Sequence, residues 1–90
     1  MEGISAKMKI KIFTPQEKLL EEEAKEVVLP GVDGELSILD FHQPFLQALR
    51  PGQVKVRPRR LLQQKKEIRL PIKRGIAKMG LLEMVILCEI

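Results

Sequence analysis

Tryptophan and tyrosine are absent from this 90-residue chain, and its aromatic side chains are three phenylalanines. Proteins that bind single-stranded nucleic acid usually stack bases on aromatic side chains, so this kind of recognition has little support here. The apolar core must be built from Val, Ile, Leu and Met instead. A chain of this length has room for one domain, residues 1–90, which buries roughly 60% of its unfolded surface.

Cysteine and histidine are equally scarce. Cys88 is the only cysteine, so no disulfide forms within the chain, and in its apolar run the thiol is expected to act as a small buried hydrophobe. His42 is the only histidine, and no spacing of carboxylates brings three or four metal ligands together. No glycine-rich turn leads into the Lys-Ser or Lys-Thr of a phosphate loop. The sequence therefore predicts no catalytic, metal or cofactor site.

Long apolar runs are also lacking, since none approaches the roughly 20 residues of a membrane-spanning helix. Charge is present but divided unevenly. Residues 1–49 hold five lysines against nine acids, a net charge of −4, whereas residues 50–90 hold eleven lysines and arginines against three acids, a net charge of +8. A basic second half is compatible with an acidic partner and equally with a solvated surface.

Three segments alternate apolar and polar residues with the period of two that indicates a strand buried on one face. They are residues 7–12, 52–57 and 67–73, with Met8, Ile10, Ile12, Val54, Val56, Ile68, Leu70 and Ile72 predicted to face inward. Pro71 cannot donate a ladder hydrogen bond, so its strand is predicted to lie at an edge or to bulge there. The closing run, residues 83–90, is apolar enough to be buried on both faces.

Residues 28–52 interleave short apolar runs with turn signals. The signals are Pro30-Gly31, Asp33-Gly34, Asp40 to Pro44, and Pro51-Gly52. Proline presets φ for a turn and glycine reaches positive φ at little cost. Strands this short and this often interrupted predict an all-β fold, an antiparallel β-sandwich of about eight to ten short strands.

The same block carries a family resemblance. Residues 29–39 read LPGVDGELSIL, and His42, Pro44, Leu46, Ala48-Leu49 and Pro51-Gly52 follow. This order resembles the ATP synthase epsilon subunit family, whose stretch typically reads LPG-x-DGE-[LF]-G-[IV]-LPGHAPLL-x-AL-x-PG. The resemblance runs from near Met8 to Glu89, nearly the whole chain. It implies the family's N-terminal domain, a sandwich of two packed antiparallel sheets.

Residues 16–27 are ambiguous. Thr14-Pro15-Gln16-Glu17 has the spacing of a helix capping box with proline at the first helical position, and glutamate-rich sequence follows. Local chemistry alone favours a helix. The family resemblance implies a strand, a short turn and a second strand, and because tertiary context overrides propensity, the strands are the prediction kept here.

The resemblance implies a non-catalytic central-stalk subunit of a proton- or sodium-driven F-type ATP synthase. Such a subunit joins gamma to the ring of c subunits, couples ion translocation to ATP synthesis, and lies on the cytoplasmic or organelle-interior face of the membrane without inserting into it. By the same resemblance Glu35, Asp40 and His42 would face the c-ring, and Gln47 would face gamma. Each of them is also compatible with a solvated surface residue.

The chain departs from the family pattern in three places. Asp40-Phe41 replaces the family's Pro-Gly, and Arg74 replaces the first residue of its Gly-Gly pair, where a positive φ would strain an arginine. The family's C-terminal helical hairpin is absent from this chain, which stops at Ile90. These 90 residues are therefore expected neither to bind ATP nor to autoinhibit.

An alternative function is a small basic β-barrel that binds RNA. Its candidate phosphate contacts are Arg57, Arg59, Arg60, Lys65 and Lys66. The absence of tyrosine and tryptophan counts against this alternative.

Overall fold

The computed structural model describes residues 7–39, 43–59 and 67–90. All regular structure in these segments is β-strand. The strands are β1 Met8–Phe13, β2 Lys18–Gly31, β3 Gly34–Leu39, β4 Phe45–Leu49, β5 Gly52–Pro58, β6 Ile68–Ile72, β7 Arg74–Met79 and β8 Glu83–Glu89. The predicted all-β fold and the expected number of strands are confirmed.

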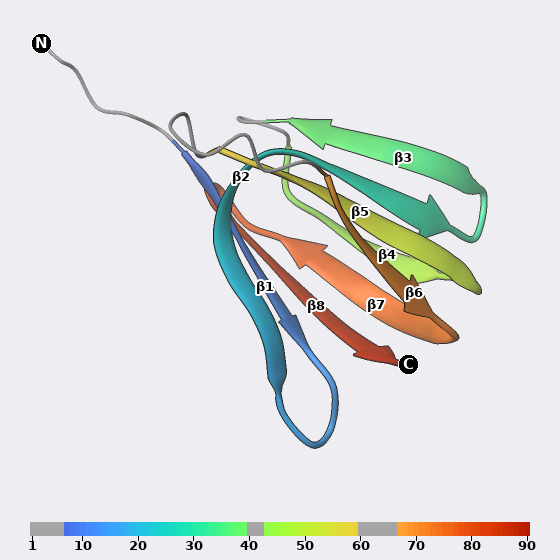
Figure 1. The fold of residues 1–90 in the computed structure, drawn as a ribbon. Helices are drawn as coiled ribbons and strands as arrows, with labels where there is room; N and C mark the ends of the chain where they lie inside the picture. The colour runs from blue at the N-terminus through green and yellow to red at the C-terminus, as the bar shows by residue number, and fades with distance from the viewer. Residues whose placement is uncertain (1–6, 40–42, 60–66) are drawn as a thin grey trace, which may run out of the picture.

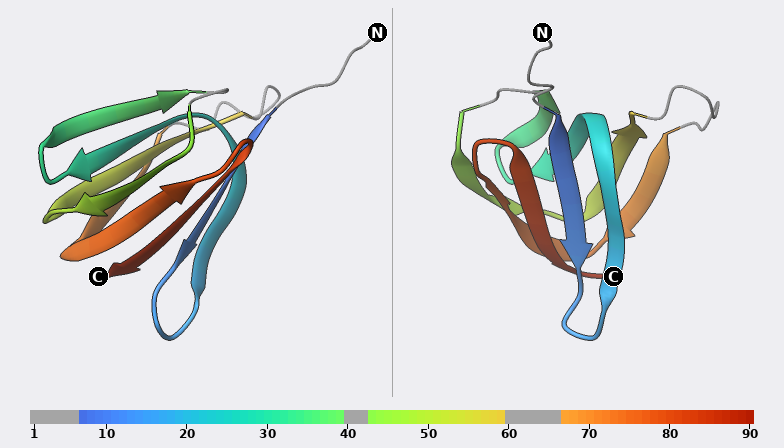
Figure 2. Two further views of the ribbon diagram at one scale, coloured as in Figure 1. Left: turned by 180° about the vertical axis from the view of Figure 1, so that it is seen from behind. Right: turned by 90° about the vertical axis from the view of Figure 1, so that its left-hand side faces the viewer.

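The strands form two layers that share one long strand (Figure 1). One layer holds β1, β8, β7 and β4, and the other holds β3, β5 and β6 around the second half of β2. The 14-residue β2 pairs first with β1 and then with β3 and β5, and its register shifts between Ala24 and Glu26, where the strand bends. Figure 2 shows β2 curving from one layer into the other. The bulge therefore lets one strand close the sandwich.

One strand pair departs from the predicted antiparallel arrangement. β1 and β8 are parallel, with Ile10 opposite Met84, while the other pairings are antiparallel. Parallel neighbours need a long connection, and here nearly the whole chain lies between them. The first and last strands of the chain are therefore neighbours in this layer.

The segment for which the sequence supported both a helix and strands is strand, not helix. Residues Leu20, Glu22 and Ala24 of β2 stand opposite β1 in antiparallel register. Thr14 supplies the capping chemistry read from the sequence, but its Oγ1 accepts hydrogen bonds from the backbone N–H groups of Gln16 and Glu17 at 3.2 Å in a turn between strands. The family's intervening turn is not present, because β2 continues through residue 25 as a bulge.

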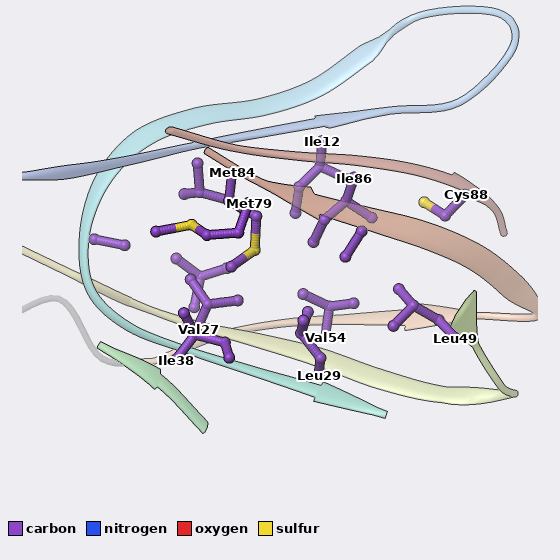
Figure 3. Packing of buried hydrophobic residues seen from close by; sticks show 14 of the residues in the cluster. Ile12, Val27, Leu29, Ile38, Leu49, Val54, Met79, Met84, Ile86 and Cys88 are labelled. Carbon is purple, nitrogen blue, oxygen red and sulfur yellow. The ribbon is translucent and has the colours of Figure 1, made fainter. Parts of the chain in front are cut away.

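The core lies between the two layers (Figure 3). Its buried members include the predicted inward residues of β1 and β5, and Ile72 of β6, with Ile68 and Leu70 partly buried against them. β6 lies at the end of the strand order, which confirms the edge position predicted from Pro71. Gly34 has a positive φ of 130° at the β2–β3 turn, as the Asp33-Gly34 signal predicts.

The prediction for the closing run is wrong in one respect. β8 buries Met84, Ile86 and Cys88, but Val85 is half-buried and Leu87 is 53% exposed. The run is thus covered on one face only, since no third layer packs on β8 in the described chain. Its other face carries apolar side chains to the molecular surface.

Candidate functional site

The described residues include one cysteine, which is buried, and no cluster of metal ligands. Within residues 7–39, 43–59 and 67–90, no group of three or more His, Cys, Asp or Glu side chains is placed to hold a metal ion. Burial raises the pKa of the Cys88 thiol, which disfavours the reactive thiolate. None of these segments forms a helix long and apolar enough to cross a membrane. The candidate sites are therefore surfaces.

The outer side of the β1–β8–β7–β4 layer carries a group of apolar side chains, called the apolar face below. Strand register aligns Ala48, Ile76, Leu87 and Phe13 across its four strands, and Leu46 and Val85 lie in the next row, with Lys78 between them. Leu46 is 66% exposed and Ile76 is 39% exposed. Because a strand's side chains alternate, these residues point away from the core that their neighbours fill. Contiguous exposed apolar side chains of this kind mark an interaction site.

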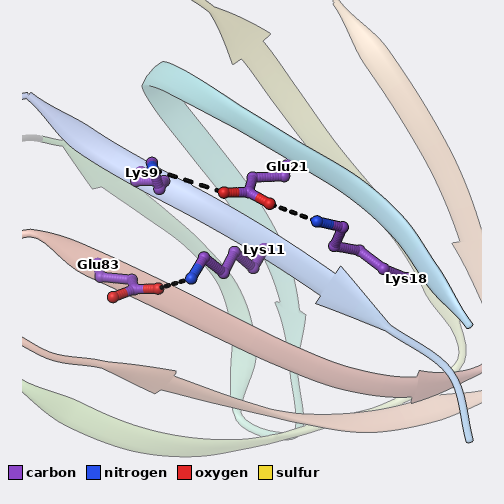
Figure 4. A network of polar contacts seen from close by, with 5 residues as sticks. All are labelled: Lys9, Lys11, Lys18, Glu21 and Glu83. Atoms are coloured by element: carbon purple, nitrogen blue, oxygen red, sulfur yellow. Dashed lines mark hydrogen bonds and ion pairs between the residues drawn. The ribbon is translucent and has the colours of Figure 1, made fainter.

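Charged side chains border the apolar face on β1 and the first half of β2 (Figure 4). Glu21 lies between Lys18 and Lys9, with a Lys9 Nζ to Glu21 Oε2 distance of 3.5 Å, and Lys11 Nζ lies 2.8 Å from Glu83 Oε2. The hydrogen bond from Lys18 lowers the pKa of Glu21, and the bond to Glu83 raises the pKa of Lys11. An apolar centre with a polar rim is the usual anatomy of a protein interface.

A pocket of about 510 Å³ lies where the apolar face meets the β1–β2 turn. Thr14 and Pro15 of that turn form one side, and the start of β7 and the end of β8 form the other. At its rim, the Arg74 guanidinium donates to Glu89, with Nε to Oε1 at 3.0 Å and Nη2 to Oε2 at 3.3 Å. This hydrogen bonding raises the pKa of Arg74. Position 74, where the family usually has glycine, is a regular strand position opposite Glu89 in this chain. The arginine there forms an ion pair with Glu89.

The outer side of the other layer is polar and is called the polar face below. Its charged and hydroxyl side chains are Glu26, Glu35, Ser37, Lys55, Arg57 and Arg69. Ser37 donates a hydrogen bond to Glu26, and Arg57 Nη1 lies 3.5 Å from Glu26 Oε1. The two faces therefore differ in balance: exposed apolar side chains prevail on the first, although Lys78 lies there, and charged ones on the second, although Leu39 lies there.

Glu35 lies at the start of β3, next to the β2–β3 turn. Its side chain is 67% exposed, and its Oε2 is 4.0 Å from Lys55 Nζ. β3 pairs with β2 only, so the other edge of β3 is open in the described chain. Asp40 and His42, predicted for the same partner, lie outside the described residues.

Gln47 lies on β4 between two residues of the apolar face, Leu46 and Ala48. Its own side chain is half-buried, and its Nε2 donates to the Ala48 carbonyl oxygen at 3.1 Å. Strand alternation directs it to the side opposite its neighbours. The segment predicted to meet gamma thus belongs to the apolar face. Its outward side chains, however, are those of Leu46 and Ala48 and not that of Gln47.

The basic residues of the RNA alternative do not form one surface in the described chain. Arg57 pairs with Glu26 on the polar face, while Arg59 is half-buried and its Nη2 donates to the Ala24 carbonyl oxygen at 3.2 Å. Arg60, Lys65 and Lys66 lie outside the described residues.

Sequence reasoning missed the apolar face and the Arg74–Glu89 pair. The signal for the apolar face was the closing run, which has apolar residues on both faces. Such a run fits a strand buried within its own chain, and it fits equally a strand that another protein covers. No local signal exists for the ion pair, because its partners are 15 residues apart and meet through strand register.

The comparisons with known proteins agree with this architecture. The family model of the ATP synthase delta/epsilon chain β-sandwich domain matches residues 7–90. The "ATP synthase epsilon chain 2" of Ralstonia nicotianae is 38% identical over 80 residues, which are 89% of this chain and 55% of the relative. The epsilon chain of Gloeothece citriformis is 43% identical over 51 residues, 57% of this chain and 37% of the relative. The chain thus spans about half or less of these relatives.

Two solved structures share the fold. One is a chain of the Euglena gracilis mitochondrial ATP synthase, in a structure of its OSCP, F1 and c-ring, with a TM-score of 0.81 and 21% identity over 97% of this chain and 53% of that chain. The other belongs to the central stalk and c-ring of the Tetrahymena thermophila mitochondrial enzyme, with a TM-score of 0.76 and 16% identity over 92% of this chain and 63% of that chain. At these identities the likeness shows the fold alone. The family match over residues 7–90 goes further: this chain belongs to the ATP synthase epsilon subunit family and forms its N-terminal β-sandwich domain.

Proposed function

We propose that this chain is a non-catalytic central-stalk component of an F-type ATP synthase that joins gamma to the c-ring and so couples ion translocation to ATP synthesis. The observation that carries the proposal is the apolar face, which no described residue covers, on a member of the epsilon family. Its task would be mechanical, since torque must pass through the joint without slip. The subunit would lie peripherally at the membrane, on the cytoplasmic or organelle-interior side.

The apolar face is the surface proposed to bind gamma. Leu46 and Leu87 are each more than half exposed, and burying such side chains against a partner contributes roughly 25 cal/mol per Å² of apolar area. The charged rim of β1 and β2 would fix the orientation of the partner, because rim charges give specificity more than affinity. Gln47 would act on this contact through the position of β4, because its side chain points to the other side of the strand.

The c-ring contact is proposed for Glu35, with Asp40 and His42 farther along the chain. A carboxylate that is 67% exposed at the start of an edge strand is free to meet a basic side chain of another subunit. Its pairing with Lys55 is long at 4.0 Å and exposed, so exchange for a closer partner would cost little.

Size-exclusion chromatography with the purified gamma subunit tests the first contact. The wild-type chain should co-elute with gamma in a one-to-one complex. Leu46→Glu places a charge on the apolar face and should abolish co-elution, and Gln47→Arg should weaken it. Gln53→Glu, an exposed change on the opposite face, is the matched control and should bind as wild type does. Failure of the folded wild-type chain to bind gamma would refute the proposal.

Capture of a purified c-ring by the preformed complex with gamma tests the second contact. Glu35→Lys reverses the exposed carboxylate and should reduce capture of the ring while gamma binding is unchanged. Glu17→Lys makes the same charge change in the exposed β1–β2 turn and should have no effect. Equal capture of the ring by both variants would show that Glu35 does not contact the ring.

A further inference from the structure

The pocket at the end of the apolar face is built from both buried and exposed residues. Leu49 and Cys88, each 4% exposed, form its floor, and Ile76 and Leu87, 39% and 53% exposed, form its outer wall. Figure 3 shows Leu49 and Cys88 at the same end of the core, on β4 and β8. The lining of the pocket thus combines core residues with residues of the apolar face, and its volume of about 510 Å³ admits a large side chain.

The rim of the pocket presents hydrogen-bond donors. A guanidinium has five N–H groups, and Glu89 accepts two of those on Arg74. The described part of the chain supplies no acceptor for the other three. The Arg74 side chain is 73% exposed, so these N–H groups are open to a partner. Because both its Nε and its Nη2 are held by one carboxylate, the guanidinium is oriented before any partner arrives.

Gly75 lines the pocket at a point where β7 and β8 approach each other closely. A Cβ there would lie 2.6 Å from the Leu87 carbonyl oxygen, closer than real Cβ atoms approach a backbone atom, and 3.0 Å from the Cys88 Cβ, a tight contact. β7 and β8 therefore approach closely beneath the Arg74–Glu89 pair. Regular pairing of β7 with β8 holds the backbone beside the pocket, so this part of the lining is formed without a ligand.

We propose that this pocket receives one large apolar side chain of the gamma-type partner, and that the unoccupied N–H groups of Arg74 bind a carbonyl or carboxylate oxygen next to that side chain. The inference rests on the proposed function, because it identifies the anchor point within the gamma contact. It draws on the continuity of the pocket with the apolar face through Ile76 and Leu87. Interfaces concentrate their affinity in such places, where an apolar anchor fills a pocket beside an oriented arginine.

Isothermal titration of the chain with purified gamma tests the inference. Ile76→Ala and Leu87→Ala remove the pocket wall, and Arg74→Met keeps an apolar stem but removes the donors. Each should raise the Kd at least about tenfold, as truncation of a central contact does. Leu81→Ala is the matched control, because Leu81 is 79% exposed and lies in the β7–β8 turn at the other end of the sheet. It should leave the Kd unchanged.

The outcomes separate the two proposals. If the wild-type chain does not bind gamma, the proposed function fails and this inference fails with it. If gamma binds and the three pocket variants bind as tightly as the Leu81 control, the pocket inference is overturned and Ile76 and Leu87 are excluded from the gamma contact, while gamma binding itself still supports the proposed function. The substituted side chains are exposed, so the fold should be retained, and melting curves of the variants check this directly.

Alkylation of Cys88 gives a second readout, because its thiol lies on the pocket floor. Reaction of the native chain with N-ethylmaleimide should be slow and should slow further when gamma fills the pocket. The Arg74→Met chain at saturating gamma should show the same protection, since the apolar anchor still enters. An unchanged reaction rate in the complex would show that the pocket stays open, and would overturn the proposal.

Discussion

Gly75 and Cys88 lie opposite each other on β7 and β8, so close that a Cβ at position 75 would stand 3.0 Å from the Cβ of Cys88. The same added atom would lie 2.6 Å from a backbone oxygen, that of Leu87, which cannot rotate away. The second glycine of the family's Gly-Gly pair is thus required by strand packing. The first position, occupied here by Arg74, has no such restriction and carries an ion pair.

Gly75→Ala should therefore destabilise the fold by about 1–3 kcal/mol, the usual cost of forcing an extra carbon into a packed site. Chemical denaturation followed by circular dichroism measures the free energy of unfolding. Gly80→Ala is the control, because the nearest atom to its added carbon is the Glu83 carbonyl oxygen at 3.6 Å, an ordinary contact. Equal stability of the two variants would contradict the close approach of β7 and β8.

Ile86→Ala should lower the free energy of unfolding by about 2–5 kcal/mol, because the side chain is fully buried between the layers and its removal leaves a cavity. Leu87→Ala, the next residue on β8, should change stability by only about 0.5 kcal/mol in the isolated chain. A comparable loss in both variants would indicate that β8 is covered on both faces, contrary to the structure.

Glu21→Gln should make the stability of the chain less dependent on pH. Hydrogen bonding from Lys18 lowers the pKa of Glu21 in the folded chain, so the carboxylate stabilises the fold above its ordinary pKa of 4.5. That contribution is lost as the pH falls through the lowered pKa of the folded state. The melting temperature of the variant should thus lie slightly below wild type near neutral pH and converge with it in acid.

Glu17→Gln is the control for that titration, since Glu17 is exposed in the β1–β2 turn and forms no ion pair with a described residue. Its melting temperature should follow wild type across the same pH range. A constant difference between wild type and Glu21→Gln down to acid pH would show that the Lys18 interaction does not cause the effect. High salt should shrink the Glu21 difference, because exposed pairs are screened.

Much of the fold follows from patterns only a few residues long. The alternation around Ile10 requires one buried face, Pro71 requires an edge, and Asp33-Gly34 requires a tight turn. These signals are local, and each corresponds to a single physical need of the backbone or core. The epsilon-like order of residues 29–52 agreed with the sandwich that the short strands predicted, while the c-ring contact it implies for Glu35 stays a prediction.

The features that could not be predicted from the sequence depend on strand register and on partner proteins. Thr14 offers the same hydroxyl to a helix cap and to a strand turn, so only pairing with β1 decides between them. Leu87 looks the same in sequence whether its face is covered by its own chain or by another. The pairing of Arg74 with Glu89, and with it the rim of the pocket, exists only once β7 and β8 are aligned.

The central claim is that this chain couples rotation to ATP synthesis, and it is tested most directly in vesicles that contain the synthase depleted of its epsilon subunit. ATP formation is measured after an ion gradient is imposed, with and without the added chain. The account predicts that the wild-type chain restores gradient-driven synthesis and that Leu46→Glu does not. Binding of the wild-type chain to gamma without any restored synthesis would contradict the claim.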